Sequence, residues 1–120
     1  MRRRDVPITV AEMAGFRTYA PKFLTPSEIV EFINFIAWNP TAGSIIRKTG
    51  GVRKVDWGAG SQGKRGGVRV IYYYQDDTVP IFLLTIYRKS QKVSLTDAEK
   101  LAIKNNVKEL KSSLKNQGAD

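Results

Sequence analysis

The residues best suited to chemistry are cations gathered in a Gly-rich stretch between residues 47 and 69. This window holds seven Lys or Arg side chains and one acid, Asp56, so it carries 7 − 1 = +6 of the chain's formal net charge of +9. Charge concentrated in this way makes a stronger local field for polyanions than the same charge scattered. The simpler reading is a solvated hairpin loop whose charges keep the chain soluble. The cations are Arg47, Lys48, Arg53, Lys54, Lys64, Arg65 and Arg69.

Composition removes support for most other kinds of site. The chain has no Cys and no His, so it lacks thiolates, disulfides, the commonest general base and the usual zinc ligands. It has no paired-carboxylate motif, and residues 58–63 do not match a Walker loop. We expect no metal and no cofactor. The apolar runs are short for a membrane span and no apolar segment follows the basic N-terminal residues, so a cytoplasmic protein without a signal peptide is predicted.

A set of cations and tyrosines can cleave RNA, because RNA carries its own nucleophile, the 2′-hydroxyl. The protein must hold the phosphate in line, neutralise the developing oxyanion and move protons. Arginine stabilises charge with a bidentate fork, and a lysine crowded by other cations can act as a base. Tyrosines can stack on bases, although strands favour aromatic residues and most of these rings are expected in the core. The tyrosines near the cations are Tyr72, Tyr73, Tyr74 and Tyr87.

Two short strands, at residues 52–57 and 68–74, are predicted to flank the basic loop. The run from Ile81 to Tyr87 is continuously apolar and rich in β-branched and aromatic residues, which indicates a central strand covered on both faces. Alternation at residues 8–13 suggests a first strand. Residues 41–51 are expected to form a connector.

Helices are indicated by capping signals. Thr25-Pro26-Ser27-Glu28 is a capping box with proline at the first helical position, and an apolar stripe runs from it to Trp38. Thr96 to Glu99 is a second capping box, and its helix is predicted to reach about residue 115. Residues 15–24 have helical spacing interrupted by Pro21, so a short helix or a turn is expected there.

These elements predict one domain over residues 1–120, with loose tails at 1–7 and 116–120. The fold class is α+β, with a small, mainly antiparallel sheet, two N-terminal helices and one C-terminal helix. The last helix carries a basic stripe, which we interpret as a solvated face in preference to a binding surface. Its members are Lys100, Lys104, Lys108, Lys111 and Lys115.

Three segments in this order resemble the HigB branch of the RelE/ParE toxin superfamily. They are GGVRKV at residues 50–55, GKRGGVRVIYYY at 63–74 and FLLTIYRKS at 82–90, followed by a C-terminal helix. The resemblance spans roughly residues 8 to 110 and is specific only in combination. It implies a toxin of a toxin–antitoxin pair with a RelE-like fold that cleaves mRNA on the ribosome without a metal. It also implies a cognate antitoxin, expected to be a helix-turn-helix protein encoded next door.

The resemblance also suggests which residues act. Arg69 matches the arginine that contacts the scissile phosphate, and Lys89 matches the basic position after the fourth strand. The preceding strand supplies a lysine at Lys54, although alternation leaves open whether Arg53 or Lys54 faces the site.

Two positions depart from RelE. Ser90 stands where RelE has a second arginine, and Thr96 stands where it has a catalytic tyrosine. Tyr87 or Tyr73 is the candidate replacement. The predicted catalytic set is Arg69, Lys54, Lys89 and Tyr87, and the predicted RNA-binding set is Arg53, Lys64, Arg65, Arg88 and Tyr73.

Two other functions are compatible with these residues. One is a non-catalytic toxin that inhibits DNA gyrase, as in the ParE branch. The other is an RNA-binding module without toxicity. Clustering of Lys and Arg on the inner strands, as opposed to the periphery, favours the endoribonuclease.

Overall fold

The computed structural model describes residues 5–58 and 67–118. Five strands and three helices follow one another within these residues. In chain order they are β1 (Val10–Glu12), α1 (Ala14–Phe23), α2 (Pro26–Trp38), β2 (Ser44–Ile45), β3 (Val52–Trp57), β4 (Val68–Tyr73), β5 (Ile81–Arg88) and α3 (Asp97–Gly118).

The strands form one sheet in the order β1-β5-β4-β3-β2. The β1–β5 pair is parallel and the other three pairs are antiparallel. The predicted α+β class, with two N-terminal helices, a mainly antiparallel sheet and a C-terminal helix, is therefore confirmed. The run at residues 81–87 is an inner strand, paired on both sides.

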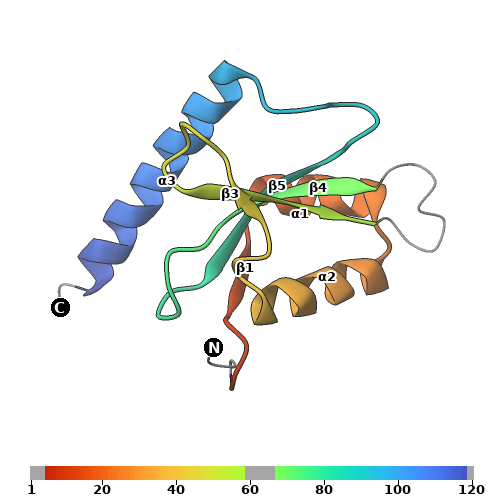
Figure 1. The fold of residues 1–120 in the computed structure, drawn as a ribbon. Helices are drawn as coiled ribbons and strands as arrows, with labels where there is room; N and C mark the ends of the chain where they lie inside the picture. The colour runs from red at the N-terminus through yellow and green to blue at the C-terminus, as the bar shows by residue number, and fades with distance from the viewer. Residues whose placement is uncertain (1–4, 59–66, 119–120) are drawn as a thin grey trace.

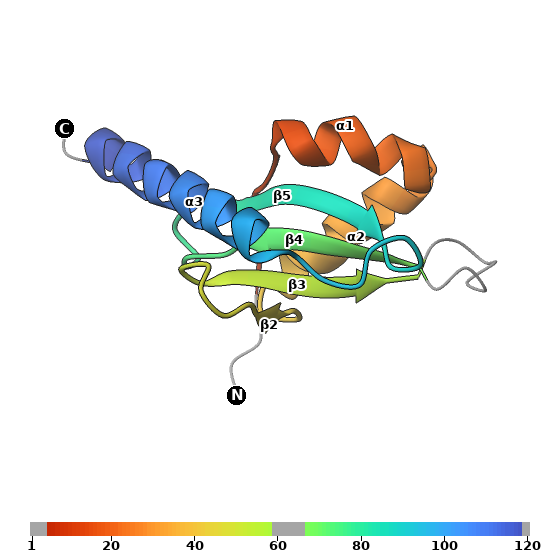
Figure 2. The same ribbon diagram turned by 90° about the horizontal axis from the view of Figure 1, so that it is seen from above.

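The sheet separates two apolar clusters, and helices cover both faces. On one face α1 and α2 bury Phe16 and Phe32 against Val70 and Leu83. On the other face α3 and the loop before it bury Val107 and Leu95. In Figure 1 α3 runs along the left-hand end of the sheet and α2 lies below the strands, and in Figure 2 the first turns of α3 lie in front of the left-hand ends of the strands. Residues of β5 enter both clusters, so this strand is covered on both faces as its apolar run predicts.

The two capping boxes begin their helices as predicted. Thr25 and Glu28 exchange hydrogen bonds between side chain and backbone (2.8 and 3.2 Å), and Thr96 and Glu99 do the same (2.8 and 3.1 Å). The predicted apolar stripe of α2 is buried at Phe32 and Ile36, whereas Val30 and Trp38, which is 45% exposed, lie at the surface.

Two local predictions need correction, at the connector and at the end of the last helix. Of the two alternatives left open for residues 15–24, the helix is confirmed, because α1 spans 10 residues and contains Pro21. Proline lies close to the C-terminal end of this helix, where its missing N–H removes one helical bond. Burial of Phe16 and Ala20 stabilises the helix and offsets the loss of this hydrogen bond. The connector contains the two-residue edge strand β2, and α3 reaches Gly118 instead of residue 115.

An irregularity in β5 sets which of its side chains share a face. Ile71 pairs with Thr85 but Tyr72 pairs with Leu83, so Leu84 is an extra residue in β5. A bulge of this kind shifts the alternation of side chains by one position. α1 approaches closely here, since a Cβ on Gly15 would lie 2.6 Å from the carbonyl oxygen of Leu84.

Across residues 5–58 and 67–118, the structure contains no helix with the length and apolar character needed to cross a membrane.

Candidate functional site

Asp56 of β3 and Arg69 of β4 form the centre of the candidate site. They are direct cross-strand partners. Arg69 donates from Nε to Oδ1 of Asp56 at 2.7 Å and from its NH2 nitrogen to Oδ2 at 3.3 Å. Its NH1 nitrogen donates to the carbonyl of Val93 at 2.9 Å, in the loop before α3. The guanidinium is thus held in a fixed orientation by a strand and a loop.

Lys89 completes this ion pair from the end of β5. Its ammonium donates to Oδ2 of Asp56 at 3.2 Å. The hydrogen bond from Arg69 is the largest influence that lowers the pKa of Asp56, and the one from Lys89 adds to it against partial desolvation. Asp56 in turn raises the pKa of Arg69, and so does Tyr87. Asp56 and Arg69 therefore stay charged around neutral pH.

The bulge in β5 brings Tyr87 to the same site. Tyr87 lies directly across from Arg69, whereas Phe82 lies across from Tyr73 on the same face. Residues 82 and 87 differ in parity, so regular alternation would have put them on opposite faces of the sheet. Asp56, Arg69, Tyr87 and Lys89 are referred to below as the arginine cluster.

The choice between Arg53 and Lys54 is decided by register. Lys54 pairs with Ile71 and alternates with Asp56, so it lies on the α3 side with Arg69. Arg53 pairs with Tyr72 on the opposite face and donates to the carbonyl of Gly43 at 2.7 Å. Lys54 is therefore the β3 cation that accompanies the arginine cluster, and Arg53 anchors the 40–45 segment.

Other predicted RNA-binding residues lie away from the cluster. Arg88 points to the α1 side, with its guanidinium carbon 5.2 Å from the centre of the Phe23 ring. Tyr73 is 4% exposed and belongs to the apolar cluster under α3. It confirms the expectation of core tyrosines, as does fully buried Tyr72. Lys64 and Arg65 lie outside the described residues.

Sequence reasoning missed the role of Asp56 and of the loop over the site. The signal for Asp56 was present, because it is the single acid in a window of seven cations. The loop is secured by Lys92, whose ammonium lies 2.7 Å from a carboxylate oxygen of Glu99 and 5.9 Å from the Tyr87 ring centre. No motif pointed to Lys92 or to the carbonyl of Val93.

Gly67 permits the strand ends to converge here. Its φ is 71°, and a Cβ at this position would lie 2.6 Å from the carbonyl oxygen of Trp57. The backbone N–H of Lys89 donates to the Gly67 carbonyl at 3.3 Å. A side chain at this position would push β3 and β4 apart just where Arg69 and Lys89 meet.

The arrangement can hold an anion and assist proton transfer. Arg69, Lys89 and Lys54 against Asp56 give 3 − 1 = +2, and the Arg69 side chain keeps 18% of its surface exposed. In the described part of the chain, no three His, Cys, Asp or Glu side chains come together as metal ligands would. No known protein-family model matches the chain, so any assignment of function rests on this geometry and on the resemblance of the three sequence segments.

Proposed function

We propose that this protein is an endoribonuclease toxin of the RelE/ParE kind, HigB-like, which cleaves mRNA on the ribosome. The observation that carries the proposal is the convergence of Arg69, Tyr87 and Lys89 at one end of the inner strands, with Lys54 beside them on β3. Three of these side chains have the charge that a phosphodiester needs, and the fourth offers a hydroxyl.

The proposed reaction uses the substrate's own nucleophile. The 2′-oxygen forms a bond to phosphorus, the bond from phosphorus to the 5′-oxygen breaks, and the products are a 2′,3′-cyclic phosphate and a 5′-hydroxyl. Arg69 stabilises the charge that develops on the non-bridging oxygens, a role that depends on preorganised donors. Lys54, after losing its own proton to solvent, takes the proton of the 2′-hydroxyl as a free amine, and Tyr87 gives a proton to the leaving 5′-oxygen.

Asp56 has a positioning role in this scheme. It occupies the Nε edge of Arg69, and the Val93 carbonyl accepts from NH1, so one N–H group on each terminal nitrogen is left for a phosphate. Its lowered pKa makes it a poor base. The carboxylate therefore orients the guanidinium and accepts no proton in the reaction.

Single-turnover cleavage of mRNA on programmed ribosomes tests the proposal. Arg69→Ala should lower the rate at saturating toxin by about 10²–10³, the typical loss for one transition-state donor, with little change in ribosome pelleting. The double variant Asp56→Asn/Arg69→Ala avoids an acid left without its arginine and should be equally slow. Lys22→Ala, on the exposed side of α1, is the control.

Three results would contradict the proposal in different ways. A wild-type protein that leaves ribosome-bound mRNA intact would exclude the nuclease. Arrested DNA supercoiling with normal translation would point instead to a gyrase inhibitor. Wild-type cleavage by Arg69→Ala at saturation would show that Arg69 only binds.

A further inference from the structure

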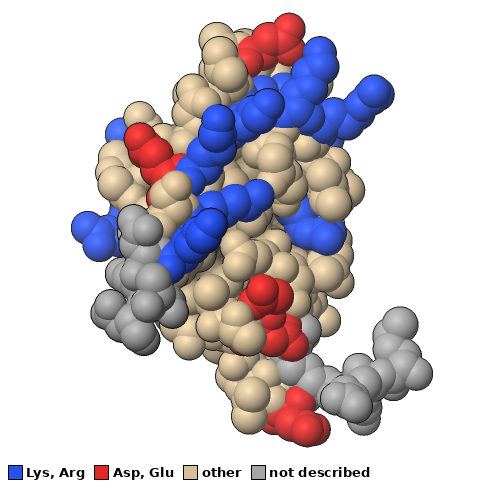
Figure 3. Space-filling model, turned by 90° about the vertical axis from the view of Figure 1, so that its left-hand side faces the viewer, with Lys and Arg blue, Asp and Glu red and all other residues tan. Residues whose placement is uncertain are grey.

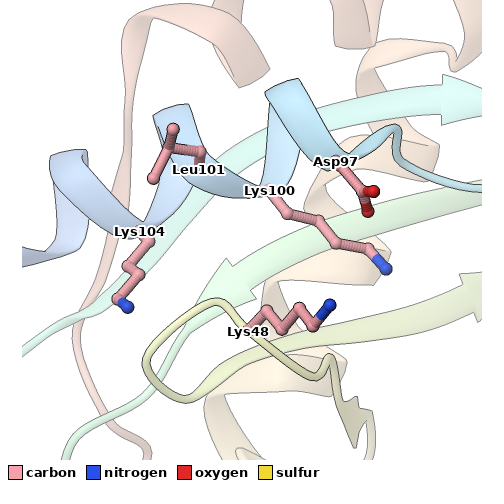
Figure 4. A pocket seen from close by; sticks show the side chains of 5 residues that line it. All are labelled: Lys48, Asp97, Lys100, Leu101 and Lys104. Atoms are coloured by element: carbon pink, nitrogen blue, oxygen red, sulfur yellow. The ribbon is translucent and has the colours of Figure 1, made fainter.

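A second basic site lies between α3 and the loop that joins β2 to β3. It is a pocket of about 350 Å³ lined by Lys48 of the loop and by Lys100, Lys104, Asp97 and Leu101 of α3. Figure 4 shows the side chains of Lys100 and Lys104 extending from α3 towards the loop that carries Lys48. We call it the lysine pocket. Its charge is 3 − 1 = +2.

Lys48 has an unusual backbone conformation for a lysine. Its φ is 67°, and it is the one non-glycine residue with positive φ in the described part of the chain. Side chains other than those of Gly, Asn and Asp rarely adopt this left-handed region, because Cβ then crowds the carbonyl. A glycine would serve the turn better. The geometry of the turn therefore does not explain why a lysine occupies this position.

The loop that presents Lys48 is rigidly built. Thr49 is fully buried, and its hydroxyl donates to the carbonyl of Ile46 at 2.6 Å and accepts from the N–H of Val52 at 3.1 Å. The N–H of Ile46 also donates to the carbonyl of Val52 at 2.8 Å. Lys48 thus faces α3 from a preorganised turn, which reduces the ordering cost of binding.

The lysine pocket continues towards the arginine cluster along one strand. Val52, at the end of the loop, and Asp56 lie four residues apart on β3, which is about 13 Å at roughly 3.3 Å per residue. Lys54 lies between them on the same face. Figure 3 shows Lys and Arg side chains gathered in a band over this side of the molecule, along α3. The two sites are close enough for one extended polyanion to reach both.

We propose that the lysine pocket binds the phosphodiester backbone of RNA at a distance from the bond that is cut; this proposal rests on the proposed function. Lysine ammonium groups bind phosphate as point charges that do not require one fixed geometry. The pocket has only Leu101 as an apolar side chain among its lining residues. This lining favours a nucleic-acid backbone over an acidic peptide, which would need apolar anchors.

The test compares salt dependence of binding for two charge-matched double variants. Lys48→Gly/Lys104→Ala removes two cations from the pocket, and glycine suits the φ of residue 48. Arg17→Ala/Lys22→Ala removes two exposed cations from α1, on the other side of the sheet. The probes are a 2′-O-methyl oligoribonucleotide, which has no nucleophile and stays intact, and vacant bacterial ribosomes. Thermal unfolding of both variants checks the fold.

Losing two phosphate contacts should flatten the slope of log Kobs against log[salt] by about 1.4, at roughly 0.7 per contact with a single strand. A flatter slope with the oligonucleotide identifies the cleaved strand as the ligand, and a flatter slope with ribosomes alone identifies ribosomal RNA. Equal slopes for the two variants with both probes would overturn the proposal. Weaker binding to poly-glutamate with unchanged RNA slopes would also overturn it, in favour of a protein partner.

These measurements do not depend on cleavage. If the wild-type protein leaves mRNA intact but the pocket variant has a flatter salt slope than the control variant, the proposed function is refuted and the lysine pocket is supported. If the wild-type protein cleaves mRNA but the two variants have equal slopes, the lysine pocket is refuted and the proposed function is supported.

Discussion

Replacing Asp56 by asparagine should tighten RNA binding and slow cleavage at the same time. Asparagine keeps the shape of the side chain and one acceptor for Arg69, but it removes the negative charge from between two cations. The charge repels an incoming phosphate, so its loss favours binding. It also fixes the guanidinium through two hydrogen bonds, and the amide nitrogen of asparagine cannot replace the second acceptor.

The size of each effect follows from the geometry. A phosphate held by the outer N–H groups of Arg69 would lie about 6 Å from the Asp56 carboxylate, where the repulsion is roughly 0.7–2.8 kcal/mol for an effective dielectric constant between 80 and 20. Asp56 keeps 48% of its side chain exposed, so the lower end applies. A change of about 1 kcal/mol corresponds to roughly fivefold tighter binding. Loosening of Arg69, which Val93 still holds, should slow the reaction by about tenfold, within the losses that misplacement causes.

Single-turnover kinetics at saturating toxin measures the rate, and equilibrium binding of a 2′-O-methyl oligonucleotide measures affinity. Glu31→Gln makes the same charge change at an exposed position on α2 and should leave both nearly unaltered. Faster cleavage by Asp56→Asn would refute the positioning role and show that Asp56 merely competes with the substrate. Unchanged binding would place the phosphate elsewhere.

Three further predictions concern the supports of the site. Lys54→Ala should slow cleavage in the single-turnover assay, whereas Arg53→Ala should leave the cleavage rate unchanged. Arg53→Ala should instead lower the free energy of unfolding by about 1 kcal/mol, the net value of one hydrogen bond. Equal losses of cleavage rate in the two variants would contradict the placement of these residues on opposite faces. Tyr72→Phe leaves the N–H of Gly43 and the carbonyl of Pro40 without their buried partner and should cost roughly 1–3 kcal/mol for each group in urea unfolding; a neutral change would show that water replaces the hydroxyl. Because the pKa of Asp56 is lowered in the folded state, its ion pairs stabilise the fold above the unfolded-state pKa, near 4, and this stabilisation is lost as pH falls through the lower folded-state pKa. Asp56→Asn should therefore lose less free energy of unfolding on acidification than the wild type does. An identical loss in both proteins would contradict the coupling.

Much of the fold could be predicted because its determinants are local. Capping boxes fix the starts of α2 and α3 through contacts between residues three apart. The run at residues 81–87 identifies an inner strand, because only a strand buried on both faces tolerates so many apolar residues in succession. The two-residue strand β2 has no such signal. Its pairing with Arg53 and Lys54 is set by contacts across the sheet.

The residues that make up the site were harder to predict, because their positions depend on contacts between strands. Arg69 and Lys89 could be named from their segments, but the faces of the sheet on which Arg53, Lys54 and Arg88 lie depend on register. Register becomes visible only once the strands are paired. Asp56 illustrates the limit, since its type and position were plain in the sequence but its two partners come from β4 and the end of β5.

The bulge at Leu84 gives the fold and the site a common cause. The shift of register at the bulge determines which β5 side chain meets Arg69. If the pairing of Phe82 with Tyr73 continued without the bulge, Ile86 would lie across from Arg69, and Tyr87 would lie across from Val68 and turn towards α1. The site would then have an apolar side chain in place of the hydroxyl. The close approach of α1 at Gly15 coincides with the extra residue, so the helix that buries one face of the sheet is packed at the position that assigns Tyr87 to the other.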